Sequence, residues 1–350
     1  MRVLYFGIYD PDYSRNRVLI KGLRLNGAEV LECNDRSKGA LKYIKLIFKY
    51  FSLKNKFDVM VVGFPGQEVM FLARILTRKP IVFDVFTSHY GGHVLDRKKH
   101  APTSLKAKWY RWLDKKSVNL TDISLLDTNA HIDFFVKEFN LPKEKFKRIF
   151  VGADSSVFYP QEDSKRHESF LVHFHGHFIP LQGTQRIIEA AKLLEADGVV
   201  FNIIGRGQDY KKGRDLAERL NARNINFIDN VPYGKLRDYI SEADICLGIF
   251  GETLKADIVI PNKVYEAIAC AKPVITADTP AIRELFTDEK DALLSRKDNA
   301  KDLADKILLL KNNSELRDQI ARGGYDLFKA KLTEEKLGAE AIAVLRKFNI

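Results

Sequence analysis

The chain has 350 residues, of which 45% are hydrophobic and 29% are charged, a composition typical of a globular protein large enough for two domains. It contains no uninterrupted apolar run of about 18 residues, so we expect no membrane-spanning helix. The first residues have the pattern of a strand rather than of a signal peptide. The three cysteines are scattered and predict neither disulfides nor a metal site. Both features lead us to expect a cytoplasmic protein.

The net charge of +11 is concentrated in the first half of the chain. Residues 1–160 hold 28 Lys and Arg against 16 Asp and Glu, whereas residues 161–350 hold 29 against 30. The excess predicts an anionic partner for the first half, such as a membrane surface or a lipid phosphate. A basic surface without a specific partner is the alternative. Because no nucleic-acid-binding motif accompanies the charge, we expect no nucleic acid partner.

Short β-branched and aromatic runs alternate with helical stretches along the chain, which predicts βαβ units. Several runs are continuously apolar, as in Val59–Val62, and this pattern indicates strands buried on both faces of a parallel sheet. A polar stretch around residues 155–168 interrupts the alternation as a linker does. The expected strands are 2–8, 29–33, 58–64, 80–86, 123–128, 147–153, 170–176, 199–205, 225–229, 245–250 and 273–278.

The repeated alternation predicts two Rossmann-like, doubly wound parallel-sheet domains that face each other across a cleft. We expect the first domain in residues 1–160 and the second in residues 161–330. Residues 331–350 are expected to form a C-terminal helix that packs back on the first domain. Ligands of such sheets bind beyond the carboxyl ends of the strands, so the segments after each strand are the candidate sites.

The loop after the first strand leads into a helix start that carries Arg15 and Asn16. Unpaired N–H groups at a helix start favour an anion, so we expect these two residues to contact a phosphate or the acceptor. Asp10 and Asp12 in the same loop have the spacing of a metal-binding Asp-x-Asp. Asp-Pro-Asp is also common turn chemistry, and two ligands are few for an oxygen-rich site, so we predict no metal there.

Residues 38–51 predict a basic amphipathic helix. Such a helix lies on an anionic membrane, or it packs on the sheet with a solvated lysine face, and both interpretations remain open. Residues 106–116 add more basic side chains and two tryptophans, which often lie at headgroup level. A peripheral position on the inner face of a membrane is therefore part of the prediction. The lysines on one side of the helix are Lys38, Lys42, Lys45 and Lys49.

Asp84 and His89 lie at the end of the strand expected at 80–86. Polar groups at a strand end are placed to contact a substrate, and the pKa range of histidine suits proton transfer. We therefore expect both residues to be catalytic. The alternative for His89 is that it only caps a loop.

The most informative segment runs from Ile260 to Thr276. Pro261 suits the first turn of a helix, and Lys263 and Glu266, three residues apart, share one face near its start. An anion is favoured there, so the lysine could hold a diphosphate and the carboxylate could accept hydrogen bonds from two ribose hydroxyls. An ordinary Lys–Glu pair on a surface helix is the alternative.

This segment resembles the signature of the retaining glycosyltransferases of family 4, whose fold is called GT-B. The strand and glycine loop Val172–Gly183, the loop Ile203–Gly207 and the junction Leu125–Pro160 resemble other parts of that family in order and spacing. The resemblance covers residues 120–345 and is looser before them.

The resemblance implies an enzyme that moves a sugar, with retention, from a UDP- or GDP-type nucleotide sugar to a hydroxyl of a glycan or lipid-linked acceptor. Cell-surface polysaccharide or glycolipid synthesis is the implied setting, with no metal or other cofactor. The second domain would bind the nucleotide sugar and the first would hold the acceptor. The implied donor residues are Gly176, His177, Gln182, Gly183, Gly205, Arg206, Lys263 and Glu266, with Glu266 on the ribose and Gly205 and Arg206 beside the base.

Two departures from the family pattern leave other functions open. Ile258 stands where the family has its first glutamate, which keeps a sugar-nucleotide epimerase on the same fold as an alternative. His177 and Gln182 stand where it has an arginine and a lysine, which keeps a non-catalytic scaffold subunit as another. The cations that could replace the missing pair are Lys263, Arg206 and Arg15.

Overall fold

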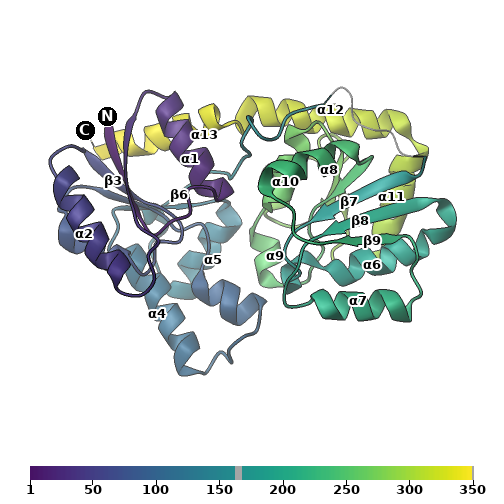
Figure 1. Cartoon of the computed structure of the whole chain (residues 1–350), viewed down its shortest axis with the longest axis horizontal. Helices are drawn as coiled ribbons and strands as arrows, with labels where there is room; N and C mark the ends of the chain where they lie inside the picture. Colours follow the sequence, from purple (N-terminus) through teal and green to yellow (C-terminus); the bar gives the residue numbers. More distant parts are fainter. Residues whose placement is uncertain (162–167, 349–350) are drawn as a thin grey trace. The chain divides into compact units, whose positions relative to one another are not determined.

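The computed structural model describes residues 1–161 and 168–348, which form two compact units. The first unit consists of Met1–Gly152 and Leu332–Ile350, and the second of Ala153–Lys331. Each unit has a six-stranded parallel sheet covered by helices (Figure 1). The α/β architecture predicted from the alternating pattern is therefore present in both halves of the chain.

In the first unit the strand order is β2-β1-β3-β4-β5-β6. The strand order reverses between β1 and β3, because β2 is added on one side of β1 and the later strands on the other. Because crossovers between parallel strands are right-handed, α1 covers one face of the sheet and α2 to α5 cover the other. The strands are β1 Arg2–Gly7, β2 Glu29–Asn34, β3 Val59–Val62, β4 Ile81–Asp84, β5 Ile123–Leu126 and β6 Phe146–Arg148. The helices are α1 Ser14–Leu25, α2 Leu41–Leu53, α3 Met70–Leu76, α4 Leu105–Asn119 and α5 Asn129–Phe139.

The C-terminal helix α13, Glu334–Leu345, packs against α1 in the first unit (Figure 1). Gly22 and Gly338 meet at this contact, and a Cβ atom on Gly338 would lie 2.1 Å from the Gly22 carbonyl oxygen. Lys21 pairs with Glu334 at 2.6 Å beside the glycines. Two glycines without side chains therefore allow the two helix backbones to touch.

The boundary between the units lies earlier than the sequence suggested. The expected boundary followed residue 160, but the chain enters the second unit at Ala153. Phe158 explains the difference, because it is completely buried in the second unit and its ring meets that of Tyr233 at 5.1 Å. Part of the predicted linker, residues 162–167, lies outside the described residues.

In the second unit the strand order is β12-β11-β10-β7-β8-β9, with the reversal between β7 and β10. Helices α6, α7 and α11 form one layer, and α10 packs against α12 (Figure 1). The strands are β7 Phe170–His175, β8 Val199–Ile204, β9 Ile225–Ile228, β10 Ile245–Leu247, β11 Val274–Ala277 and β12 Leu293–Ser295. The helices are α6 Thr184–Leu193, α7 Tyr210–Arg219, α8 Leu236–Glu242, α9 Leu254–Ile258, α10 Asn262–Ala269, α11 Ala300–Asn312 and α12 Ser314–Lys331.

Among the described helices, none combines the length and the hydrophobicity that crossing a bilayer requires. The longest, α12, is 18 residues long and carries charged side chains along its length.

Candidate functional site

The predicted donor residues gather where β7 ends and α10 begins, beside the strand-order reversal of the second unit. Ligands of open parallel sheets bind at such reversals. Gly176 directly follows β7 with φ +151, a conformation that favours glycine, and its amide donates to the Ile204 carbonyl at 3.0 Å. A Cβ atom on Gly205, which follows β8, would lie 2.1 Å from the Gly176 carbonyl oxygen. The loops after the two strands are therefore in direct contact.

Lys263 occupies the corner between these loops and the first turn of α10. Its side chain is buried, and its ammonium donates a hydrogen bond to Gln182 Oε1. A Cβ atom on Gly176 would lie 3.0 Å from Lys263 Nζ. Lys263 Nζ itself lies 4.7 Å from the centre of the Phe174 ring. Burial lowers the pKa of Lys263 to about 7, although Glu266 opposes the shift. The Lys263 ammonium thus meets a neutral oxygen and an aromatic ring at this corner.

Glu266, one turn further along α10, is held by a histidine from β7. His175 Nε2 lies 2.8 Å from Glu266 Oε2, and His175 Nδ1 lies 2.9 Å from His173 Nε2. All three side chains are buried, and burial lowers the pKa of His173 well below its usual value. A neutral His173 that donates from Nε2 makes His175 Nδ1 an acceptor, which leaves His175 Nε2–H to donate to the carboxylate. The two histidines thereby fix the orientation of Glu266.

The remaining donor residues line the edge of this site. Gly183 has φ +64 and precedes α6, and a Cβ atom there would lie 2.4 Å from the Phe250 carbonyl carbon. Arg206 is exposed, pairs with Asp229 and lies with its guanidinium 4.0 Å from the Tyr210 ring centre. His177 is also exposed. Arg206 and His177 therefore lie at the surface, whereas the other predicted donor residues lie in or against the buried corner.

His173 and His175 are residues that the sequence interpretation did not single out. Their spacing of two places both side chains on the same face of a strand, immediately before the glycine loop. That alternation is the signal that could have identified them. Ile258, which the resemblance places at the position of the family's first glutamate, ends the short helix α9 as a buried apolar side chain.

Two residues expected to contact a ligand in the first unit are instead buried with each other. Arg15 donates from Nη2 to Asp84 Oδ1 at 2.8 Å, and both side chains are 0% exposed. Arg15 Nη1 donates to the carbonyl oxygens of Ile149 and Phe150 at 2.7 and 2.8 Å. Burial raises the pKa of Asp84, and the Arg15 guanidinium opposes that shift. These contacts occupy both side chains within the first unit, and the catalytic role expected of Asp84 and the phosphate contact expected of Arg15 stay predictions.

Asn16 is held by hydrogen bonds within the first unit, and the ligand contact expected of it stays a prediction. Its side-chain amide donates to the carbonyl oxygens of Asp10 and Phe64 at 3.0 and 2.7 Å, and it accepts from the Tyr5 hydroxyl at 3.0 Å. The carboxylates of Asp10 and Asp12 pair with Arg36 and Arg17, both at 2.9 Å. Among the described residues, no group of three or more His, Cys, Asp or Glu side chains is arranged to hold a metal ion.

His89 lies in the loop after β4 with partners different from those of Asp84. Its backbone N–H donates to Asp114 Oδ1 at 3.1 Å. Its half-buried ring is stacked with the rings of His93 and Tyr110, at centroid distances of 5.9 and 5.7 Å. The structure therefore does not combine Asp84 and His89 into one catalytic pair.

Comparison with known proteins identifies the family of the second unit. Residues 158–327 match the family described as glycosyl transferases group 1. The chain is 27% identical over 195 residues to an uncharacterised glycosyltransferase of Methanocaldococcus jannaschii, covering 54% of this chain and 50% of that protein. It is 26% identical over 200 residues to N,N'-diacetylbacillosaminyl-diphospho-undecaprenol alpha-1,3-N-acetylgalactosaminyltransferase of Campylobacter jejuni, covering 54% and 51%. The chain thus spans about half the length of these curated relatives.

Solved structures are similar over nearly the whole chain. Sucrose-phosphate synthase from Thermosynechococcus elongatus superposes with a TM-score of 0.78 at 13% identity, covering 99% of this chain and 98% of that one. Anabaena HepE in complex with UDP and glucose gives a TM-score of 0.76 at 15% identity, covering 99% and 100%. At such identities the likeness shows the fold alone. It confirms the predicted GT-B fold of two Rossmann-like parallel-sheet units.

Proposed function

Residues 158–327 belong to the glycosyl transferases group 1 family, and from this premise we propose that the chain is a glycosyltransferase that uses a nucleotide-diphosphate sugar. The observation that carries the proposal is the buried corner in which Lys263 Nζ lies against Gly176, one helical turn from the Glu266–His175 pair. A cation beside an open loop and a helix start suits a diphosphate. A buried, oriented carboxylate suits a ribose.

In this proposal Lys263 exchanges its hydrogen bond to Gln182 for one to the diphosphate of the donor. The positive charge then stabilises the negative charge that develops on the leaving phosphate. The missing side chain of Gly176 leaves room for a phosphate oxygen to approach the ammonium. The family's loop lysine is replaced by Gln182 here, so the cation comes from α10 instead.

Glu266 is proposed to accept hydrogen bonds from the ribose hydroxyls of the donor. The His173–His175 pair holds the carboxylate in place before the ligand arrives, which lowers the ordering cost of binding. Arg206, which is exposed in the loop after β8, is proposed to lie beside the base of the donor.

We propose that the sugar is transferred with retention of anomeric configuration, by front-face attack in which the leaving phosphate takes the proton of the acceptor. The protein then contributes positioning and charge stabilisation rather than a nucleophile.

The acceptor is proposed to be a glycan or a lipid-linked glycan held by the first unit, as part of cell-surface polysaccharide or glycolipid synthesis. The undecaprenol diphosphate in the name of the Campylobacter relative supports a lipid-linked acceptor. An anionic membrane surface on the inner side of the cell is proposed as a further partner of the first unit.

The first experiment is a thermal-unfolding screen of the full chain with UDP, GDP and their sugar conjugates. A ligand that binds only the folded state raises its stability by RT ln(1 + [L]/Kd), so the nucleotide that binds most tightly should raise Tm most at a given concentration. Glu266→Gln should abolish most of that rise. Glu218→Gln, a change of an exposed carboxylate on α7, serves as the matched control. If no nucleotide raises Tm, the donor site is assigned incorrectly.

Product analysis then distinguishes the alternatives. Transfer that requires both donor and acceptor supports the proposal, with the anomeric configuration read by NMR. Conversion of the donor sugar without an acceptor would indicate the epimerase left open by Ile258. Nucleotide binding without turnover would indicate a scaffold subunit.

We also propose that transfer persists in a chelator, because a side-chain ammonium and a helix start balance the diphosphate. Metal-reversible loss of activity would contradict that part.

A further inference from the structure

Large apolar side chains are exposed mainly on one helical layer of the first unit. Of the 14 exposed large hydrophobic residues in the described chain, eight lie on α2, α3 and α4. Monomeric proteins rarely leave such a concentration in contact with water unless it binds something. The eight residues, which we call the α2–α4 face, are Leu41, Ile44, Phe48, Phe51, Ile75, Leu105, Trp109 and Trp112.

Helix α2 carries half of this face as one continuous stripe. The exposed residues Leu41, Ile44, Phe48 and Phe51 follow the spacing that places side chains on one side of a helix. Phe48 is 72% exposed and Phe51 is 54% exposed, whereas the buried positions of α2 are Leu46 and Tyr50. Both interpretations open at the level of sequence remain, because α2 packs on the unit through Leu46 and Tyr50 and its outer side carries apolar as well as lysine side chains. The helix packs through a narrow strip and presents apolar side chains outward.

The three helices form one connected layer. The Tyr50 hydroxyl donates to the Leu76 carbonyl at 2.7 Å, which joins α2 to α3. The rings of Phe71 and Trp112 stack at 5.5 Å, which joins α3 to α4. The apolar side chains thus belong to neighbouring helices on the same side of the sheet.

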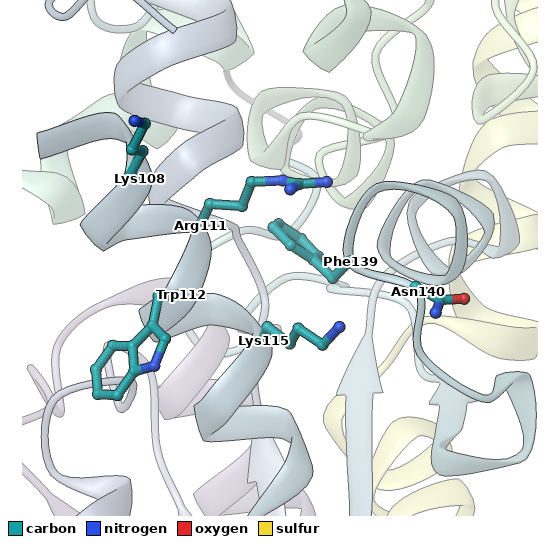
Figure 2. Close-up of a pocket in the computed structure, with 6 residues that line it drawn as sticks. All are labelled: Lys108, Arg111, Trp112, Lys115, Phe139 and Asn140. Atoms are coloured by element: carbon teal, nitrogen blue, oxygen red, sulfur yellow. The ribbon is translucent and has the colours of Figure 1, made fainter. Parts of the chain in front are cut away.

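Basic side chains flank the apolar ones on α2 and α4. On α2, Lys45 and Lys49 lie beside the stripe, and both are exposed. On α4, Lys108, Arg111 and Lys115 line a pocket of about 360 Å³ together with Trp112, Phe139 and Asn140. Figure 2 shows Arg111 and Lys115 reaching from α4 toward Phe139, while Trp112 points to the other side of the helix.

We propose that the α2–α4 face docks on the surface of an anionic lipid bilayer. The apolar stripe would enter the boundary between headgroups and acyl chains, with the lysines and Arg111 at the level of the lipid phosphates. Tryptophans such as Trp109 and Trp112 are favoured at that level. Charge complementarity selects this occupant, because residues 1–160 carry a balance of +12 and the cations flank the apolar residues. The reason for docking rests on the proposed function, since a membrane position would bring the enzyme to a lipid-linked acceptor.

The test is co-sedimentation of the full chain with vesicles of phosphatidylcholine, with and without phosphatidylglycerol. We expect binding to the anionic vesicles at low salt and much weaker binding to the neutral ones. Changing Lys45 and Lys49 to Glu should weaken binding by about fivefold or more for each lysine, since each contributes about 1 kcal/mol near an anionic surface. Lys336→Glu with Lys347→Glu, on exposed positions of the C-terminal segment, makes the same charge change and should have little effect.

The apolar contribution has its own variant. Phe48→Ser with Phe51→Ser should reduce vesicle binding even at low salt, whereas Leu193→Ser on the exposed side of α6 should not. These side chains are exposed, so unfolding and nucleotide-induced stabilisation should be unchanged in every variant. That readout separates failure of docking from failure of the donor site.

Three results would overturn the proposal. The first is a parent chain that ignores anionic vesicles at low salt, and the second is a phenylalanine variant that binds as well as the parent. The third is a dimer in sedimentation velocity that Phe48→Ser dissociates, without any vesicle binding, because the face would then be covered by a second copy of the chain.

Discussion

Arg15 and Asp84 form an ion pair in which neither side chain is exposed to solvent, although 69 residues separate them in the sequence. The pair joins the start of α1 to the end of β4, and Arg15 also donates to two carbonyl oxygens just after β6. It therefore links three parts of the first unit at the carboxyl edge of its sheet.

Removal of one partner should destabilise the first unit strongly. Asp84→Ala leaves the buried Arg15 without its counter-charge, and such changes cost about 3–5 kcal/mol. We expect this loss in urea unfolding of the full chain. Arg15→Met with Asp84→Leu should recover much of it, because apolar residues of similar size need no counter-charge. If Asp84→Asn instead keeps full stability and nucleotide binding but loses transfer, Asp84 is catalytic after all.

Most strands were predictable because they lie in or beside β-branched and apolar runs, such as Val59–Val62 in β3. The strand β12, Leu293–Ser295, was not predicted, because its two leucines form no longer run, whereas β10, which is equally short, begins the longer apolar stretch 245–250. The proximity of Lys263 and Glu266 could be predicted because both lie on one helical turn, where spacing in the sequence decides which side chains are neighbours. The Arg15–Asp84 pair was not readable, because a contact between distant segments depends on the packing of the whole unit. Arg15 and Asp84 were therefore expected at a ligand.

Contact between Gly22 and Gly338 should be intolerant of any side chain. A Cβ atom on Gly338 would overlap the Gly22 carbonyl, so Gly338→Ala must push α13 away from α1. We expect a loss of about 1–3 kcal/mol in the free energy of unfolding, which is typical of overpacking. Gly234→Ala is the control, because no atom lies within 4 Å of its Cβ position. Equal stability of the two variants would show that the helices pack less closely.

The two histidines behind Glu266 should affect recognition of ribose. His175→Phe removes the N–H that holds the carboxylate, and a hydrogen bond to a charged group contributes about 1.5–3 kcal/mol, or roughly 10- to 100-fold in affinity. We expect weaker binding of the nucleotide and a smaller preference over its 2′-deoxy form, measured by calorimetry. His173→Phe should have a smaller effect of the same kind. An unchanged ribose preference in His175→Phe would show that the pair does not act on the ribose.

Lys263 should make diphosphate binding depend on pH. Burial lowers its pKa to about 7, so in the free protein it loses its proton as the pH rises above that value. A bound diphosphate favours the ammonium, so binding takes up a proton and the affinity should fall between pH 7 and pH 9, by up to about tenfold per unit. Calorimetry in two buffers of different ionisation enthalpy measures the uptake. Lys263→Met should abolish it and weaken the diphosphate more than the monophosphate.

The same lysine predicts how the stability of the unliganded protein changes with pH. In the unfolded chain its pKa returns to about 10.4, so between about pH 7 and pH 10 the unfolded state binds more protons than the folded state. Stability therefore rises with pH across this window, since its slope follows the excess of protons bound in the unfolded state. Lys263→Met should remove that rise, whereas Lys211→Met on exposed α7 should keep it. A parent chain whose stability is flat over the window, with diphosphate affinity equal at pH 7 and pH 9, would show that Lys263 stays charged. The diphosphate would then meet a permanent cation, and proton uptake would have no part in donor binding.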